Sequence, residues 1–155
     1  MSGEFSQVSI LGAGLLGGSL ALALRALPQP PEVRLWARKP EALAEAQKIG
    51  LESSFTTDLS EAVKGADLVI LCVPVGAMPA LLGAAIEAGL PETCLVTDVG
   101  SVKRAPHETL PLLLAKHGAS FIGSHPMAGS ERTGLAAASV DLFQNAACLL
   151  TNDNH

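Results

Sequence analysis

The sequence predicts an α/β domain with a mostly parallel, doubly wound sheet that is covered by helices on both faces. Short runs rich in β-branched and other apolar residues alternate with helical windows along the chain, as in parallel strands joined by crossover helices. With 155 residues, of which 48% are hydrophobic and 16% charged, the chain has enough apolar material for one buried core. We therefore expect a single domain over residues 1–155, with its core over about 7–151.

The first half of the chain is expected to hold three strand–helix units. The first helix should stop where a group of three prolines follows it. Gly50 is expected to end the second helix, and Asp58 or Ser60 to cap the third. The expected strands are 7–11, 33–37 and a weak one at 53–56, and the expected helices are 15–27, 40–49 and a short one that ends near residue 65.

The second half continues this alternation, and an unbroken apolar run closed by Pro74 is its clearest strand. Pro106 and Pro111 lie in the helical region that follows Ser101, so we expect that helix to be kinked or split at one of them. The expected strands are 68–73, 93–98, 120–122 and 147–150, and the expected helical segments end near residue 88, follow residue 101 and cover 135–139.

A glycine motif lies between the first strand and the first helix. Gly12, Gly14 and Gly17 have the spacing G-x-G-x-x-G. In dinucleotide-binding βαβ units the first glycine permits a tight turn, the second lets a pyrophosphate approach the backbone, and the third lets the helix pack on the strand. The motif in this place predicts a dinucleotide-binding domain of the Rossmann type. The alternative is a glycine-rich turn that serves only helix packing.

The end of the second expected strand bears on the choice of dinucleotide. An NAD site usually places Asp or Glu there to bind the ribose 2′-hydroxyl, whereas this sequence reads Trp36-Ala37-Arg38-Lys39-Pro40. Arg38 and Lys39 stand where a 2′-phosphate would lie, and a guanidinium binds phosphate with two hydrogen bonds. NADP is therefore the favoured cofactor and NAD the second choice; the alternative interpretation is an ordinary solvated basic pair.

Two polar residues follow strands of the second half, at the edge where such sheets bind ligands. His125 is the one histidine of four in a Gly/Pro-rich loop after an expected strand. A histidine titrates near neutral pH and suits a general base; the alternative is a structural loop histidine. Ser101 is expected to cap the helix after it, and its hydroxyl is also placed to reach a nicotinamide or to orient His125. Lys103 is expected to be solvated or structural.

Several motifs occur here in one order. They are the glycine motif, Val73-Pro74, the junction Asp98…Gly100-Ser101-Val102-Lys103, the run His125-Pro126-Met127-Ala128-Gly129-Ser130-Glu131, and Leu142-Phe143 downstream. Together they resemble the prephenate/arogenate dehydrogenase family of tyrosine biosynthesis over almost the entire chain. The His-Pro-Met-Ala-Gly run is far more specific than the glycines.

The resemblance implies oxidative decarboxylation of a cyclohexadienyl acid, prephenate or arogenate. His125 would accept a hydrogen bond or proton from the ring hydroxyl, hydride would leave the same carbon for the nicotinamide, and carbon dioxide would depart as the ring becomes aromatic. Ser101 would hold His125 and the nicotinamide in register, and Ser130 and Glu131 would lie at the substrate mouth, Ser130 replacing a common Thr. The expected cofactor contacts are Gly12, Gly14, Leu15, Leu16, Gly17, Arg38, Lys39, Val73, Pro74, Gly100 and Ser101.

Members of this family continue into a helical C-terminal domain that builds a homodimer and supplies basic residues for the substrate carboxylates. The resemblance therefore implies that this chain is the cofactor half of such an enzyme, inactive or weakly active alone, with a homodimeric full-length protein. Two alternatives stay open. One is another NADP-dependent dehydrogenase of the 3-hydroxyacid or imine-reducing type, and the other is a non-catalytic NADP(H)-sensing module.

Composition argues against several other classes of protein. The chain has 10 basic and 15 acidic residues and a net charge of −5, without a basic run, so no nucleic-acid partner is expected. Residues 8–27 are nearly uncharged and long enough to span a bilayer, but their glycines indicate a strand, a turn and a helix, so no membrane contact is expected. Cys72, Cys94 and Cys148 lie far apart in apolar runs and indicate reduced core residues, with no metal site and a cytoplasmic location.

Overall fold

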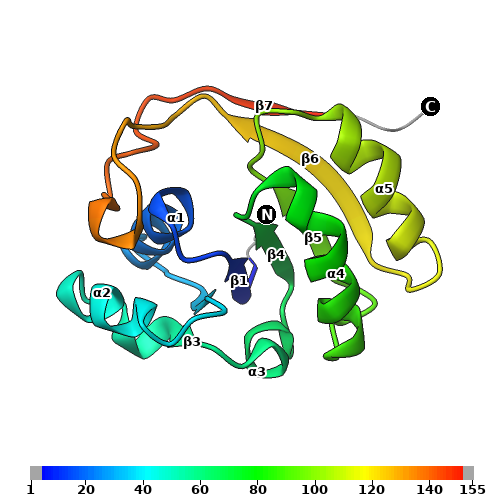
Figure 1. The fold of residues 1–155 in the computed structure, drawn as a ribbon, viewed down its shortest axis with the longest axis horizontal. Coiled ribbons are helices and arrows are strands. Elements are labelled where there is room, and N and C mark those ends of the chain that lie inside the picture. The colour runs from blue at the N-terminus through cyan, green and yellow to red at the C-terminus, as the bar shows by residue number, and fades with distance from the viewer. Residues whose placement is uncertain (1–4, 152–155) are drawn as a thin grey trace.

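A computed structural model describes residues 5–151 as one sheet with helices on both sides (Figure 1). The strands of this range have the order β3-β2-β1-β4-β5-β6-β7. The first six are parallel and β7 runs antiparallel to β6. The bounds are β1 Gln7–Leu11, β2 Glu32–Trp36, β3 Phe55–Thr56, β4 Leu68–Leu71, β5 Leu95–Asp98, β6 Ser120–Pro126 and β7 Cys148–Leu150.

Helices connect the parallel strands and cover both faces of the sheet. In Figure 1, α1 and α2 lie on one side of the strands, and α4 and α5 lie on the other. The α-helices are α1 Leu15–Arg25, α2 Ala42–Lys48, α3 Leu59–Val63, α4 Met78–Glu87 and α5 Arg104–Leu114, and the short 3-10 helices are η1 Glu52–Ser54, η2 Val75–Ala77 and η3 Leu135–Ala137. The predicted doubly wound α/β fold is confirmed.

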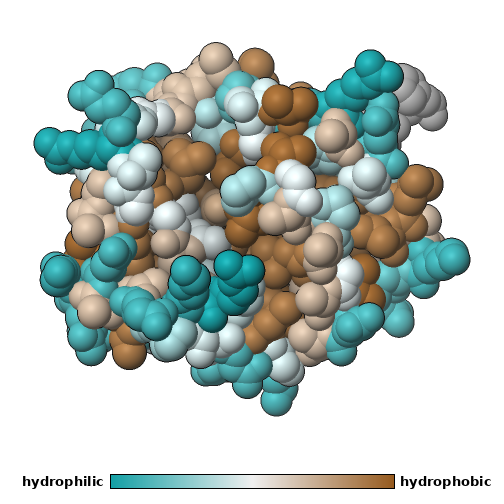
Figure 2. All heavy atoms as spheres, in the orientation of Figure 1, coloured by the Kyte–Doolittle hydropathy of each residue, from teal (hydrophilic) through white to brown (hydrophobic). Residues whose placement is uncertain are grey.

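The alternation of side chains along each strand divides the core into two layers. Ile10 and Ile70 pack on the side of α1 and α2, whereas their neighbours Leu11 and Leu71 pack on the side of α3, α4 and α5. All four are buried. Because both faces of β1 and β4 are covered, both sides of these strands are mostly apolar. The exception is Ser9 of β1, which is buried and donates a hydrogen bond to the carbonyl oxygen of Ala62. On the face shown in Figure 2, apolar side chains gather toward the middle and hydrophilic ones at the periphery.

Local signals explain where several helices begin and end. Asp58 is the N-cap of α3, and its carboxylate accepts hydrogen bonds from the N–H groups of Ser60 and Glu61. Gly50 follows α2 with a φ of 72°, a left-handed conformation that favours glycine. None of the helices in the described range is long and apolar enough to cross a bilayer.

Three expectations differ in detail from the structure. The helix with two prolines, expected to be kinked or split, is not split: α5 is continuous, with Pro106 in the first turn, where no N–H partner is needed, and Pro111 inside the helix. His125 does not lie in a loop, because β7 pairs with residues 124–126 and extends β6 through it. Cys148 is exposed rather than buried, since β7 is the outer strand of the sheet.

Candidate functional site

The strand order reverses between β1 and β4, and in sheets of this kind ligands bind at the carboxyl ends of the strands beside that point. Two cavities lie there. The first has a volume of about 510 Å³ and is lined by the glycine turn, the end of β2 and the start of α4. The second has a volume of about 420 Å³ and is lined by residues that follow β4, β5 and the end of β6. Val73 and Pro74 line both cavities, which places the two side by side.

Two glycines of the turn are required by the fold itself. Gly12 has a φ of 129°, and a Cβ there would overlap the carbonyl group of Cys72. A Cβ at Gly17 would overlap the carbonyl oxygen of Gly12. At Gly14, by contrast, no atom lies within 4 Å of the Cβ position. The protein leaves room for a side chain at Gly14, so glycine at this position leaves space for an external ligand.

The helix that follows the turn offers hydrogen-bond donors to such a ligand. Gly14 is the N-cap residue of α1, no side chain caps this helix, and its first turn has no acidic residue. The N–H groups of the first turn therefore keep the capacity to bind an anion, supported by the helix dipole. Leu16 lines the second cavity and Leu15 lines neither of the two.

The first cavity has basic rather than acidic character at the end of β2. Ala37 and Arg38 contribute to its lining, which includes no Asp or Glu among residues 5–151. The side chain of Arg38 is exposed. Lys39 is also exposed but does not belong to the lining. The structure thus brings Arg38 to the cavity and leaves Lys39 beside it.

The second cavity brings together the two candidate catalytic residues. His125, half-buried near the end of β6, and Ser101, exposed on the loop after β5, both line it, together with Gly100. Strands β5 and β6 are adjacent, which explains why residues 24 positions apart meet. Within the described residues no hydrogen bond joins the two side chains. Ser101 also does not cap α5, because that helix begins after Lys103 and has no side-chain cap.

Sequence reasoning missed a buried charge network beside this cavity. Asp98 is fully buried at the end of β5 and pairs with the ammonium group of Lys103. Lys103 Nζ also donates to the carbonyl oxygen of Ser124 at 2.6 Å, and Ser124 Oγ donates to the carbonyl oxygen of Asp98 at 2.6 Å. Lys103 was expected to be either solvated or structural, and these contacts give it a structural role. The signal that could have revealed this network is an aspartate at the end of the strand Leu95–Asp98, which was expected to lie inside the sheet and would need a buried partner there.

The expected substrate-mouth residues lie outside the cavity lining. Ser130 and Glu131 are exposed on the loop after β6, whereas Pro126 and Ala128, earlier in the same run, line the cavity. Ser130 Oγ accepts a hydrogen bond from the backbone N–H of Arg132 at 3.1 Å. The loop therefore starts at the cavity and carries Ser130 and Glu131 away from its wall.

Cys72 belongs to the lining of the second cavity but is unsuited to act as a nucleophile. Burial raises the pKa of its thiol far above the usual value, and the negative charge of Asp98 raises this pKa further. The thiol therefore stays protonated at neutral pH, and only the thiolate is a good nucleophile. No group of three His, Cys, Asp or Glu side chains within the described range is arranged to hold a metal ion.

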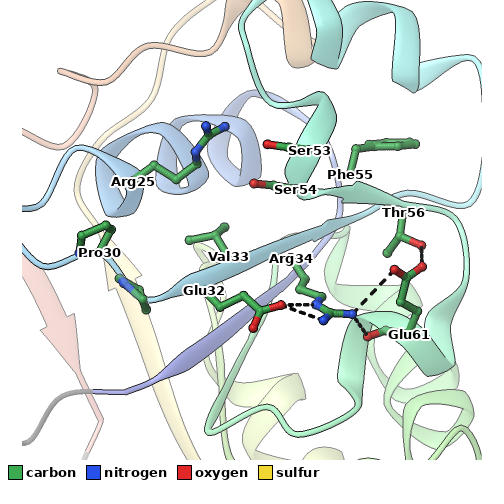
Figure 3. Close-up of a pocket in the computed structure, with 11 residues that line it drawn as sticks. Arg25, Pro30, Glu32, Val33, Arg34, Ser53, Ser54, Phe55, Thr56 and Glu61 are labelled. Atoms are coloured by element: carbon green, nitrogen blue, oxygen red, sulfur yellow. Dashed lines mark hydrogen bonds and ion pairs between the residues drawn. The ribbon is translucent and has the colours of Figure 1, made fainter.

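A further hollow lies at the opposite part of the sheet, beside β3 (Figure 3). Three of its charged groups are engaged with one another: Arg34 forms ion pairs with Glu32 at 2.6 Å and with Glu61 at 3.7 Å. Arg25, by contrast, donates to an uncharged group, the carbonyl oxygen of Gly50, at 2.5 Å.

Comparison with known proteins identifies relatives of the whole described domain. The model of the family described as prephenate dehydrogenase, nucleotide-binding domain, matches residues 20–155. The chain is 37% identical over 151 residues to cyclohexadienyl dehydrogenase of Zymomonas mobilis, covering 97% of this chain and 50% of the relative. It is 35% identical over 148 residues to prephenate dehydrogenase of Lactococcus lactis, covering 96% of this chain and 41% of the relative. The chain thus spans half or less of the length of these relatives.

Solved structures agree with this result. Prephenate dehydrogenase of Aquifex aeolicus, in complex with hydroxyphenyl propionate and NAD+, superposes with a TM-score of 0.84 at 28% identity, covering 99% of this chain and 53% of that one. Arogenate dehydrogenase of Synechocystis superposes with a TM-score of 0.78 at 33% identity, covering 94% of this chain and 49% of that one.

Proposed function

Because the chain belongs to the prephenate dehydrogenase family, in which it corresponds to the nucleotide-binding domain, we propose that it is the cofactor half of an NADP-dependent oxidoreductase. The substrate is a cyclohexadienyl acid, prephenate or arogenate, and the reaction is an oxidative decarboxylation. The observation that carries this proposal is the meeting of His125 and Ser101 in one cavity next to the glycine turn. Tyrosine biosynthesis, a cytoplasmic location and a homodimeric full-length protein belong to the same proposal.

The residues present fit a dinucleotide. Open space at Gly14 and the uncapped N-terminus of α1 suit a pyrophosphate. The cavity at Arg38 suits the adenosine end, and its guanidinium supports NADP over NAD because it can bind a 2′-phosphate where a carboxylate would repel one. The adjoining cavity at His125 and Ser101 suits the nicotinamide end. When bound, the nicotinamide supplies the acceptor for a hydride.

The protein side chains supply position and a base. His125 in its neutral form accepts the proton of the ring hydroxyl, and this transfer favours loss of hydride from the carbon that bears the oxygen. Ser101, on the same cavity wall, orients the reacting groups with its hydroxyl. Apolar neighbours such as Val73 and Pro126 limit the access of water to this space. Loss of carbon dioxide follows from formation of the aromatic ring, so no further acid or base is required for it.

Turnover tests the proposal directly. Since the chain covers half of the Zymomonas mobilis relative, it is assayed after extension with the remaining half of that relative, with the intact relative as positive control. We expect reduction of NADP+ that depends on prephenate or arogenate. We further expect His125→Asn to lower turnover by about 10²–10⁴-fold, the usual contribution of a positioned base, with little change in cofactor affinity. An extended protein that folds and binds NADP+ but oxidises neither acid would contradict the proposal.

A further inference from the structure

The parallel pairing between β5 and β6 ends just before Ser124 and His125, the part of β6 that brings His125 to the second cavity. Its last register pair joins Asp98 and Gly123. Ser124 and His125 lie beyond it, and on their β5 side no ladder pair holds them. On their other side β7 pairs with both residues. Toward the loop that carries Ser101, the bonds come from the network of Asp98, Lys103 and Ser124.

The carboxylate of Asp98 connects both sides of the cavity. On the Ser101 side, Oδ2 accepts a hydrogen bond from the N–H of Gly100 at 2.9 Å. On the His125 side, Oδ1 accepts a longer one from the N–H of Ser124 at 3.4 Å. Gly100 and Ser124 each immediately precede a candidate catalytic residue in the sequence. One buried side chain thus binds the backbone just before Ser101 and just before His125.

Lys103 closes the network from the loop side. Its ammonium group pairs with Asp98 Oδ2 and donates to the carbonyl oxygen of Ser124 at 2.6 Å. The Asp98 side chain is 0% exposed and that of Lys103 is 21% exposed, so the pair loses much of its hydration. Apolar residues of the same volume often stabilise a core as well as such a pair does, whereas the charged pair imposes one geometry. This combination favours a role in geometry over a role in stability.

We propose that the Asp98–Lys103 ion pair, together with Ser124, is a positioning unit that fixes the positions of His125 and Ser101 relative to each other across the second cavity. The unit touches neither cofactor nor substrate and acts through the backbone on either side of it. This inference rests on the proposed function for its catalytic consequence. The geometric part concerns this chain alone and is testable in the absence of turnover.

The test compares the single variants Lys103→Met and Asp98→Asn with the double variant. Lys103→Met leaves the buried Asp98 carboxylate without its partner, and Asp98→Asn leaves the partly buried Lys103 ammonium group without its partner, so we expect a clear fall in Tm in both. The double variant is neutral, and we expect its Tm to return close to the wild-type value. The matched control is Arg104→Met, which removes an exposed neighbouring cation paired with Glu108 at 2.8 Å and should leave every readout unchanged.

The decisive readout is the NMR signal of the His125 ring in this chain, assigned by its loss in His125→Asn. In the double variant we expect this signal to move or broaden, and its response to NADP+ to be lost, while the NADP+ Kd stays the same. His117, whose ring contacts the carbonyl oxygen of Leu90 at 2.9 Å, serves as the internal control. In the extended protein kcat should fall roughly 10²-fold without a change in cofactor KM, as expected for a displacement of about 1 Å.

The outcomes separate the two proposals. If the His125 signal and its NADP+ response in the double variant equal those of the wild type, the positioning proposal is overturned, whatever the turnover. If Tm and kcat recover together in the double variant, the pair is only structural and the proposal is also overturned. If the wild-type extended protein oxidises neither acid while the His125 signal changes as expected, the positioning unit stands and the proposed function fails.

Discussion

Gly14 differs from its neighbours in that nothing inside the protein explains the absence of its side chain. Its backbone, with φ −113° and ψ −162°, is extended and open to any residue, and the Cβ position is empty. We predict that Gly14→Ala leaves Tm nearly unchanged but weakens NADP+ binding roughly tenfold, the effect of one lost charge-assisted hydrogen bond of about 1.5 kcal/mol. Calorimetry and thermal unfolding measure the two effects.

Gly17→Ala is the matched comparison for this prediction. Its Cβ would overlap the carbonyl oxygen of Gly12, so this variant should lose stability first and binding as a consequence. An equal loss of stability in both variants would show that the two glycines serve the same structural purpose.

Arg38 decides the choice of cofactor if the proposed site is right. Its side chain is exposed at the first cavity, so Arg38→Ala should hardly change the stability of the protein. Loss of a charged bidentate contact should weaken NADP+ binding by about 1.5–3 kcal/mol, roughly 10–150-fold, and leave NAD+ binding nearly the same. Titration with both cofactors checks this, with the exposed Lys48→Ala as control. A wild-type chain that binds NAD+ as tightly as NADP+ would disprove the role of Arg38.

At the scale of elements, the short helix α3 depends on its cap. It has five residues, too few to be stable by propensity, and the Asp58 carboxylate binds two of its first N–H groups. We predict that Asp58→Ala lowers the free energy of unfolding by about 0.5–2 kcal/mol, whereas Asp58→Asn, which caps equally well, changes it little. Urea denaturation measures both. Equal losses in the two variants would indicate that the charge of Asp58, and not its cap, matters.

For the whole molecule, burial divides the three thiols into two classes. Burial raises the pKa of Cys94 to about 12, with the charge of Asp67 adding to this effect, and raises that of Cys72 further. A raised pKa lowers the thiolate fraction at a given pH, so both should resist alkylation at neutral pH and react only as the pH rises or the protein unfolds. Cys148 is exposed.

We therefore predict that iodoacetamide modifies Cys148 first in the native protein, and that the other two thiols react at a comparable rate only in denaturant. Mass spectrometry of the digested protein follows each site. In Cys148→Ser the fast phase should disappear. Rapid native labelling of Cys72 would mean that the second cavity opens far more than the structure indicates.

Much of the fold was predictable because parallel strands buried on both faces are locally encoded. The strand around Ile70, Leu68–Leu71, is apolar at every position, and in the strand around Ile10 only Ser9 interrupts the apolar run from Val8 to Leu11. Gly12 and Gly50 mark the turns that need left-handed backbone. The candidate site was predictable in part for the same reason: the glycine turn follows β1 directly, Ser101 lies in the loop after β5, and His125 lies near the end of the neighbouring strand β6. These relations depend on short stretches of sequence and on the general rule for sheets of this class.

The sequence by itself thus determined the doubly wound class, the place of the glycine turn, and Arg38, Ser101 and His125 as candidates. Only the tertiary structure decided that His125 lies on a strand, since β7, which is joined to β6 by a long connection, pairs with it. It also decided that α5 runs unbroken and that Lys103 turns back to the buried Asp98. The physical reason is that strand pairing and the burial of a charge depend on partners that are distant in sequence. A local sequence pattern does not specify which distant residue that partner is.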